Sequence, residues 1–190
     1  MKAWPALVLA MALPTGLAAQ QTSPPANPIT EAFRGRTMTL HRNLAQAFDS
    51  IPAARFGYRP TPAQQTVGFI AQHLVTDNYL FCNAFGPMKA TRAPADTATA
   101  DSVKATWPRE TLVAQLKASF AFCESAFAQL DDAKLAEQVP VTFRGNTRNV
   151  TRASMVLGHT LDMADHYSQI ANYMRLNGLL PPTALPRPRP

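Results

Sequence analysis

Three ionisable residues near the end of the chain are spaced so that a helix would carry them on one side. At about 100° of rotation per residue, His159, Asp162 and His166 fall within about 60° of arc. That arc borders an apolar stripe, so the three side chains are expected on the shoulder of a core-facing surface. A buried carboxylate beside imidazoles is costly unless a positive charge compensates it, and a metal ion supplies such a charge. The spacing therefore favours a metal site.

A second apolar segment offers one more candidate ligand. His73 lies one turn beyond Phe69 and Ile70, on one shoulder of an apolar stripe. In a helical bundle that shoulder can face the segment of Asp162 and His166, and these three residues are the predicted metal ligands. Two imidazoles and a carboxylate suit a divalent zinc, nickel, iron or manganese ion. Three protein ligands leave positions open for water or substrate, which suits catalysis.

A simpler interpretation stays open for each histidine. A lone histidine on an apolar shoulder is more often a hydrogen-bonded core residue than a ligand. His159 and His166 could pair with Asp162 or with charged residues on other helices. His41, beside two leucines of its own segment, is interpreted as a structural or surface residue.

Length and composition limit the classes of function. The 190 residues suffice for one domain, and with 46% hydrophobic and 16% charged residues the chain should form a packed core. Eight glycines without a glycine-rich phosphate loop argue against P-loop and Rossmann chemistry. The net charge is +6, but the basic residues are scattered singly, so no specific nucleic-acid partner is expected.

The first residues are typical of an export signal. Lys2 precedes an apolar stretch from Trp4 to Leu17, and small residues follow at 16–19. A membrane span needs about 20 apolar residues, so a cleaved signal peptide over residues 1–19 is favoured over an anchor. The mature chain is then periplasmic or secreted, without a membrane span. Residues 20–28 are predicted to be a proline-rich linker, and residues 183–190 a flexible proline- and arginine-rich tail.

Cys82 and Cys123 are the only cysteines of the chain. An even number in an exported protein favours a disulfide, and the alternative is two buried thiols. Cys82 lies about 180° around its helix from His73, so the disulfide and the metal site could face different neighbours. The link would close a loop of about 42 residues and stabilise the fold by roughly 4 kcal/mol in the chain-entropy model.

Four segments with helical periodicity predict an all-α four-helix bundle with long connections. In the first, Asn27 is the expected N-cap; in the second, Thr61, Pro62 and Gln64 form a capping-box pattern; in the last, Gly178 is placed to cap the end. Residues 90–105 are expected to be a surface loop and residues 139–147 an irregular stretch with a turn at 144–146, and no strand is predicted. The predicted helices are 29–51, 62–85, 108–130 and 151–177.

Two sequence patterns resemble the DinB-like family. One begins with His166-Tyr167-Ser168-Gln169 and continues as YMRLNGLLPP over residues 173–182. The other is Ile70-Ala71-Gln72-His73-Leu74, followed one turn later by Asn78-Tyr79. Thr151-Arg152, ahead of the last helix, also fits the family. The resemblance covers residues 29–182, nearly all of the mature chain.

The resemblance implies a four-helix bundle in which a divalent metal is held by three histidines, one from the second helix and two from the fourth. His73 and His166 match two of these positions. Asp162 stands where the family usually has the remaining histidine, and Ser168 replaces a glycine. His159, one turn before Asp162, could substitute as a ligand or support the ligands by hydrogen bonding.

The expected function is metal-dependent chemistry on an unidentified small molecule. Some relatives are thiol-dependent transferases or isomerases, which implies a thiol S-transferase, and direct hydrolysis is the other reaction that such a metal supports. The alternative is a non-catalytic metal- or ligand-binding bundle with a structural or vestigial site. An interaction module that uses the basic surface and the tail is the third hypothesis. A homodimer is left open.

Overall fold

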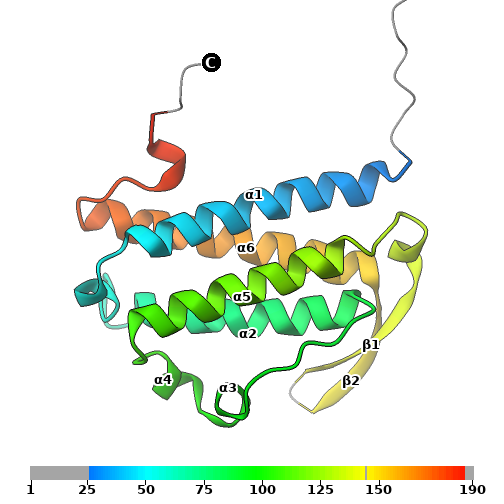
Figure 1. The fold of residues 1–190 in the computed structure, drawn as a ribbon, viewed down its shortest axis with the longest axis horizontal. Coiled ribbons are helices and arrows are strands. Elements are labelled where there is room, and N and C mark those ends of the chain that lie inside the picture. Colours follow the sequence, from blue (N-terminus) through cyan, green and yellow to red (C-terminus); the bar gives the residue numbers. More distant parts are fainter. Residues whose placement is uncertain (1–25, 144, 187–190) are drawn as a thin grey trace, which may run out of the picture.

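Four long helices form the body of the protein in a computed structural model, which describes residues 26–143 and 145–186 (Figure 1). The expected signal peptide, part of the linker and residues 187–190 of the tail lie outside the described residues. The helices pack side by side and confirm the predicted four-helix bundle. They are α1 (Pro28–Ser50), α2 (Val67–Phe85), α5 (Arg109–Phe127) and α6 (Arg152–Leu176). Three single turns of 3₁₀ helix lie at Ala53–Arg55, Lys134–Ala136 and Pro182–Ala184.

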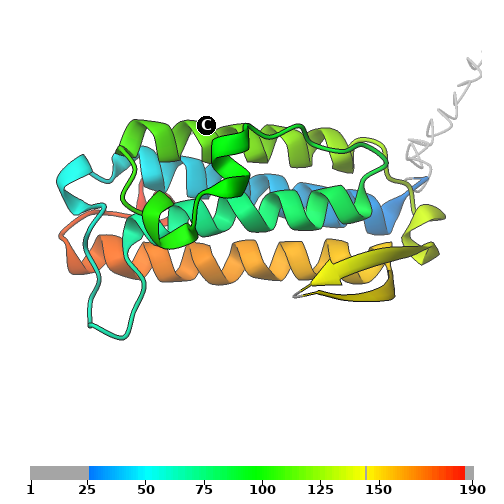
Figure 2. The same ribbon diagram turned by 90° about the horizontal axis from the view of Figure 1, so that it is seen from below.

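Each long helix packs on two others, so that α2 contacts α5 and α6, and α1 contacts the same two helices from the opposite side (Figure 2). A crossover over residues 86–108 carries the chain back along the bundle, and α2 and α5 therefore run in the same direction. Asn78 contacts Ser119 and, one turn further along α2, Cys82 contacts Cys123 one turn further along α5, as expected for parallel helices. In contrast, α2 and α6 are antiparallel, because His73 meets His166 while Asn78 meets His159.

Two adjoining apolar clusters fill the interior. The larger joins α1, α2, α5 and α6 around fully buried side chains such as Leu44, Ile70 and Met163. The smaller surrounds the disulfide and includes Phe85 and Phe127. These residues come from the four helical stripes, so burial of the stripes fixes the orientation of every helix face. None of the helices within the described residues is both long and apolar enough to cross a bilayer.

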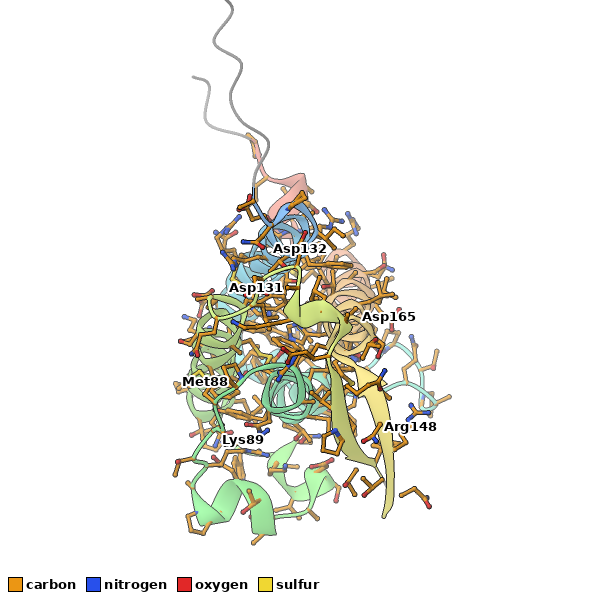
Figure 3. All side chains as sticks on the ribbon, turned by 90° about the vertical axis from the view of Figure 1, so that its right-hand side faces the viewer. Met88, Lys89, Asp131, Asp132, Arg148 and Asp165 are labelled. Atoms are coloured by element: carbon orange, nitrogen blue, oxygen red, sulfur yellow. A yellow bond between two sulfur atoms is a disulfide. The ribbon has the colours of Figure 1, made fainter. Side chains whose placement is uncertain are left out.

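The ends of α1 and α6 agree with the predicted segments within about two residues. Asn27 occupies the N-cap position of α1, but its side chain makes no capping bond to the helix. Asp132 lies after α5 (Figure 3), and its carboxylate accepts hydrogen bonds from the backbone N–H groups of Ile29 at 3.1 Å and Thr30 at 2.7 Å. At the end of α6, Gly178 adopts a φ of +72° and closes the last turn.

The predicted start of the second helix is wrong. Thr61 and Gln64 form an isolated turn, in which the Gln64 N–H donates to the Thr61 carbonyl at 3.1 Å. The helix begins at Val67, where Thr66 Oγ1 accepts from the Phe69 N–H at 3.1 Å. The backbone N–H groups of Val67 and Gly68 bond instead to carbonyls of residues 58 and 56, which holds residues 59–66 as a loop.

Two connections contain secondary structure that the sequence did not predict. The expected loop over residues 90–105 carries two short helices, α3 (Pro94–Ala98) and α4 (Asp101–Lys104). The expected irregular stretch is an antiparallel hairpin of β1 (Gln138–Phe143) and β2 (Asn146–Thr151), with Gly145 at a φ of +79° in the turn. Val139 is the one buried residue in either strand. Because the hairpin buries so little, its sequence lacks the alternation that marks a strand.

Candidate metal centre

The side chains of His73 and His166 meet between α2 and α6. Their ring centroids are 5.0 Å apart and the rings are almost perpendicular, at 82°. The His166 side chain is 10% exposed and that of His73 is 32% exposed. The two imidazoles thus lie at the edge of the core with one side open to solvent, as the shoulder positions in the sequence predicted.

A carboxylate stands one turn away from each imidazole on its own helix. Asp77 Oδ2 is 3.1 Å from His73 Nε2, and Asp162 Oδ1 is 3.5 Å from His166 Nε2. Ligand atoms of His73, Asp77 and His166 all lie within 4.8 Å of one another, close enough for one ion to bind all three. The structure therefore brings together the predicted His73 and His166, places Asp162 against His166, and adds Asp77.

Asp77 is the site residue that the sequence analysis missed. It follows His73 by four residues, which is the same spacing as that between Asp162 and His166. Residues at this spacing lie on one face of a helix, so the spacing in His73-Leu74-Val75-Thr76-Asp77 could have identified it. Because α2 and α6 run antiparallel, the two His–Asp pairs face each other.

The electrostatics of the site favour a bound cation. Burial raises the pKa of Asp77 to about 6, and burial together with the nearby Asp77 charge raises that of Asp162 to about 6. Burial, followed by the charge of His166, lowers the pKa of His73. Asp162 Oδ2 is buried without a hydrogen-bond partner among the described residues. A divalent ion would neutralise both carboxylates and occupy this unpaired oxygen, so the donor set fits a metal.

A chain of hydrogen bonds fixes the ring of His166. The Tyr173 hydroxyl donates to the Gln65 carbonyl at 3.1 Å, and the Gln169 amide nitrogen donates to the Tyr173 oxygen at 3.3 Å. Gln169 Oε1 therefore faces His166 Nδ1, 3.1 Å away, and accepts its proton. The lone pair then sits on Nε2, the atom that faces Asp162, and a support of this kind is typical of metal-bound histidines.

His159 and His41 lie elsewhere in the core. His159 is fully buried, and its Nε2 is 2.9 Å from Asn78 Oδ1 beside the disulfide rather than in the group formed by His73, Asp77 and His166. His41 stacks on Phe120 with ring centroids 4.3 Å apart and is a buried structural residue. The predicted link between Cys82 and Cys123 is present.

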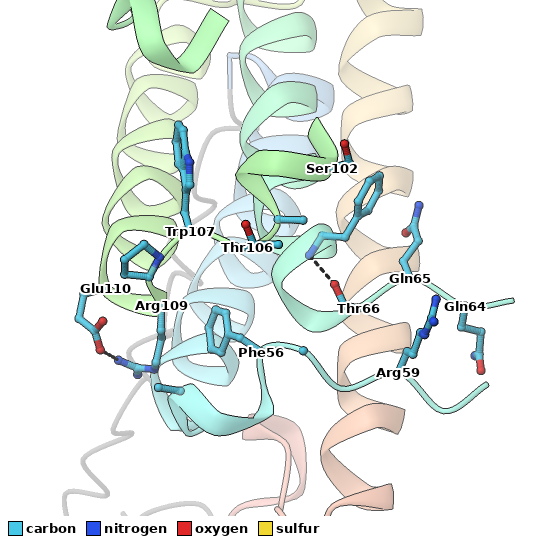
Figure 4. A pocket seen from close by; sticks show the side chains of 15 residues that line it. Phe56, Arg59, Gln64, Gln65, Thr66, Ser102, Thr106, Trp107, Arg109 and Glu110 are labelled. Atoms are coloured by element: carbon cyan, nitrogen blue, oxygen red, sulfur yellow. Dashed lines mark hydrogen bonds and ion pairs between the residues drawn. The ribbon is translucent and has the colours of Figure 1, made fainter. Parts of the chain in front are cut away.

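A cavity of about 740 Å³ lies among residues 53–69 and 102–110 (Figure 4). Phe69 lines it and also stacks against the His73 ring, with centroids 6.0 Å apart. Other parts of its wall are the aromatic rings of Phe56 and Trp107 and the polar side chains of Arg59, Gln64 and Ser102. The cavity has the size and mixed apolar and polar lining of a small-molecule site.

The short helix α4 borders both the cavity and the candidate ligands. Ser102 belongs to the cavity wall, and the adjacent Asp101 acts electrostatically on His73 and on Asp77. Arg109, also at the cavity, is held by the structure, because its Nε donates to the Ile51 carbonyl at 2.9 Å and its Nη2 to the Asp49 carbonyl at 2.7 Å. Phe69 and α4 thus adjoin both His73 and the cavity, whereas none of the candidate ligands lines the cavity.

The fold and the site together define a four-helix bundle with a candidate His/Asp/His metal centre between its second and last long helices. The profile of the DinB superfamily matches residues 37–170, which is most of the chain. The protein belongs to the DinB superfamily. No curated protein matches the chain in a sequence comparison.

Solved structures share this fold at low sequence identity. A DinB-like protein from Bacillus cereus is 19% identical with a TM-score of 0.61, over 80% of this chain and 95% of that one. A conserved protein from Enterococcus faecalis is 15% identical with a TM-score of 0.57, over 78% and 96%. A mycothiol-dependent maleylpyruvate isomerase is 14% identical with a TM-score of 0.59, over 74% of this chain. The present chain spans only 60% of the length of that isomerase.

Proposed function

We propose that the protein binds a divalent metal ion between α2 and α6 and uses it to transform a small molecule. The observation that carries the proposal is the convergence of His73, Asp77 and His166 at one solvent-reaching point, with Asp162 beside His166. The Oδ2 atom of Asp162 has no hydrogen-bond partner among the described residues. His73 Nε2 and His166 Nε2 are the nitrogen ligands, and Asp77 and Asp162 supply the oxygen ligands.

A divalent cation at this point lowers the pKa of a bound thiol or water and so provides a nucleophile near neutral pH. The protein side chains set the conditions for that chemistry. Gln169 holds the proton of His166 on Nδ1, so that Nε2 stays available. The half-exposed His73 leaves one side of the site accessible, and the cavity behind Phe69 can hold the body of a substrate.

Thiol transfer is the reaction class that we favour. A structure with the same fold is a mycothiol-dependent isomerase, so a thiol-dependent reaction is compatible with this architecture. Hydrolysis by the same site needs water in place of the thiol and is the second reaction to assay. The non-catalytic alternative is a bundle whose metal serves only structure or binding.

The metal is tested first. The chain from residue 20 onward, prepared without chelators, should contain close to one equivalent of a divalent metal by mass spectrometry. His73→Ala and His166→Ala should lose it. His41→Phe, which changes a buried histidine outside the site, is the matched control and should retain it. Full metal content in both alanine variants would refute the ligand assignment.

The reaction is tested next with the same proteins. Conjugation of a small thiol to electrophiles and hydrolysis of esters are measured with and without added zinc, nickel or manganese. Turnover that requires metal and disappears in His166→Ala supports the enzyme proposal. A metal-loaded protein that turns over none of these substrates favours the non-catalytic alternative.

We also propose that the protein is exported to the periplasm or secreted. The proposal rests on the signal-like residues 1–19 and on the disulfide between Cys82 and Cys123, since disulfides persist in oxidising compartments. Mass spectrometry of the N-terminus after expression of the full chain tests it. Cleavage near Ala19 is expected, and a mature protein that still begins at Met1 would contradict it.

A further inference from the structure

A second cluster of metal-ligating side chains lies in the core, away from the His73 site. Cys82 on α2, Cys123 on α5 and His159 on α6 are all fully buried. His159 Nε2 is 3.8 Å from Cys82 Sγ and 3.7 Å from Cys123 Sγ, so it stands almost equally far from both sulfurs. Three different helices thus direct two sulfur atoms and one imidazole nitrogen to one point.

These distances fit a tetrahedral zinc centre. With zinc–sulfur bonds of about 2.3 Å and zinc–nitrogen bonds of about 2.0 Å, sulfur and nitrogen ligands lie about 3.5 Å apart along an edge of the tetrahedron. The nitrogen of His159 is 3.8 Å and 3.7 Å from the two sulfurs, slightly more than this separation. Once the disulfide opens, only the sulfur atoms have to move apart, and side-chain rotation can provide that movement.

The oxidised protein keeps this site closed. The sulfurs are bonded to each other, and Asn78 is hydrogen-bonded to Nε2 of His159. The Asn78 amide nitrogen donates to Ser119 Oγ at 2.8 Å, so its Oδ1 faces His159 and accepts the proton of Nε2 at 2.9 Å. In this state neither the sulfurs nor Nε2 has a lone pair suited to a metal. His159 Nδ1 has no partner among the described residues and can take the ring proton instead.

We propose that reduction of the disulfide converts Cys82, Cys123 and His159 into a second metal site, which binds zinc. A dithiol reductant donates two electrons and two protons, becomes a disulfide itself, and leaves two thiols in the protein. Zinc binding then releases both thiol protons to solvent, while the neutral imidazole moves its proton from Nε2 to Nδ1 by exchange with solvent. The products are a zinc dithiolate–imidazole centre and two free protons.

The consequence of this site is a crosslink that does not depend on oxidation. The disulfide joins α2 to α5, and zinc would join α2, α5 and α6. A newly made chain in a reducing compartment lacks the disulfide, and zinc would hold the same core together until the cysteines are oxidised. The site is independent of the proposed function, because none of its residues belongs to the His73 group.

The test uses the double variant H73A/H166A, in which the first site cannot compete for metal. A phosphine reductant replaces the dithiol because it does not compete strongly for the ion, and cobalt(II) serves as the spectroscopic probe for zinc. The reduced variant should bind one equivalent of cobalt, with sulfur-to-cobalt charge-transfer absorption and the visible bands of tetrahedral coordination. The oxidised variant should show neither signal.

Zinc should displace the cobalt and raise the melting temperature of the reduced variant by several degrees, without changing that of the oxidised variant. His159→Gln should weaken cobalt binding at least tenfold, and if it fails to fold, the melting comparison still decides. Reduced H73A/H166A that binds no cobalt, or binds it without sulfur charge transfer, would overturn the proposal. So would an equal effect of zinc on the reduced and oxidised proteins.

Discussion

The rings of His73 and His166 meet edge to face, 5.0 Å apart, and each is followed or preceded by an aspartate four residues away on its own helix. Antiparallel packing of α2 and α6 turns these His–Asp and Asp–His pairs toward each other. Each helix therefore contributes one imidazole and one carboxylate to this region: the ligand atoms of His73, Asp77 and His166 lie within 4.8 Å of one another, and Asp162 contacts His166. Burial raises the pKa of both carboxyl groups, with a further increase from the charge of Asp101 for Asp77 and from the charge of Asp77 for Asp162.

The first prediction concerns the two carboxylates as ligands. Asp77→Asn and Asp162→Asn should each weaken divalent metal binding about tenfold to a hundredfold, and the double variant should weaken it further. Isothermal titration calorimetry measures the effect. Asp165→Asn, on the exposed side of α6, is the matched control; its charge acts only weakly on Asp162, and the variant should lower the affinity less than either ligand variant. An unaltered affinity in Asp162→Asn would remove Asp162 from the ligand set.

The second prediction is that the Asp77 carboxylate destabilises the metal-free protein. The pKa of Asp77 is raised to about 6 in the fold, so its ionisation favours unfolding as the pH rises from about 4 to about 6. In the presence of a chelator at pH 8, Asp77→Asn should raise the free energy of unfolding by about 1–3 kcal/mol, and at pH 3.5 the gain should vanish.

Saturating metal should reverse that order, because the wild type then gains more binding energy than Asp77→Asn. Urea unfolding at the two pH values, with chelator and with metal, provides all four comparisons. A variant that is less stable than the wild type under every condition would show that the Asp77 charge is already compensated within the protein.

Periodicity predicted the parts of this structure that large buried stripes determine. The stripe of residues 151–177 placed His166 and Asp162 at the edge of the core, and that of the second helix placed His73 on the facing shoulder. Burial of such stripes is the main driving force for the bundle. Sequence separation of four then links each candidate ligand to a neighbour on the same face.

The features that the sequence did not reveal are those with little burial or with long-range partners. The hairpin buries only Val139, and the start of α2 depends on carbonyl groups of residues 56 and 58. Asp77 lies between the polar residues Thr76 and Asn78 and looked like an ordinary polar position until α6 was packed against it. The capping of α1 by Asp132 likewise joins residues about a hundred positions apart, which no local pattern can indicate.

A third prediction concerns Gln169, which orients His166 without touching the expected metal position. Gln169→Leu should weaken metal binding about tenfold or more, because Nδ1 loses the acceptor that keeps the ring proton away from Nε2. Gln169→Glu retains an acceptor and should restore most of the affinity. The tautomer of His166, read from nitrogen chemical shifts in NMR spectra, should change only in Gln169→Leu. Equal binding by both variants would exclude this role.

A fourth prediction tests the contact that positions α4 beside the site. A Cβ at Gly68 would overlap the carbonyl oxygen of Ala105, so Gly68→Ala should force α2 and α4 apart and cost about 1–3 kcal/mol of stability. Gly35, in the middle of α1, has no atom within 4 Å of such a Cβ, and Gly35→Ala should stabilise the protein by up to about 1 kcal/mol. Chemical unfolding of both variants makes the comparison. If both variants were stabilised equally, the carbonyl of Ala105 could not lie as close to Gly68 as the structure places it.

The fifth prediction concerns the stability that the buried histidines lose in acid, a contribution opposite in sign to that of the Asp77 carboxylate in the same pH range. Burial lowers the pKa of His159 to about 3 and, together with the nearby His159, lowers that of His41 to about 2, against 6.5 for an exposed imidazole. Below pH 6.5 the unfolded chain therefore binds protons on these histidines that the folded protein does not bind. The stability from each histidine is complete above pH 6.5 and is lost as the pH falls from 6.5 toward 3.

Each histidine should contribute a slope of up to about 1.4 kcal/mol per pH unit in that range. His41→Phe keeps the stacking against Phe120 and removes one titrating group. The variant should therefore lose about half of the pH dependence that the two histidines together give to the free energy of unfolding between pH 4 and pH 6. Both ring nitrogens of His41 are buried without a partner among the described residues, and the variant should therefore be at least as stable at pH 7. The measurement is the free energy of unfolding from pH 4 to pH 8 with a chelator present, which removes the contribution of bound metal. An unchanged slope in His41→Phe would mean that His41 is protonated in the folded protein as readily as in the unfolded chain.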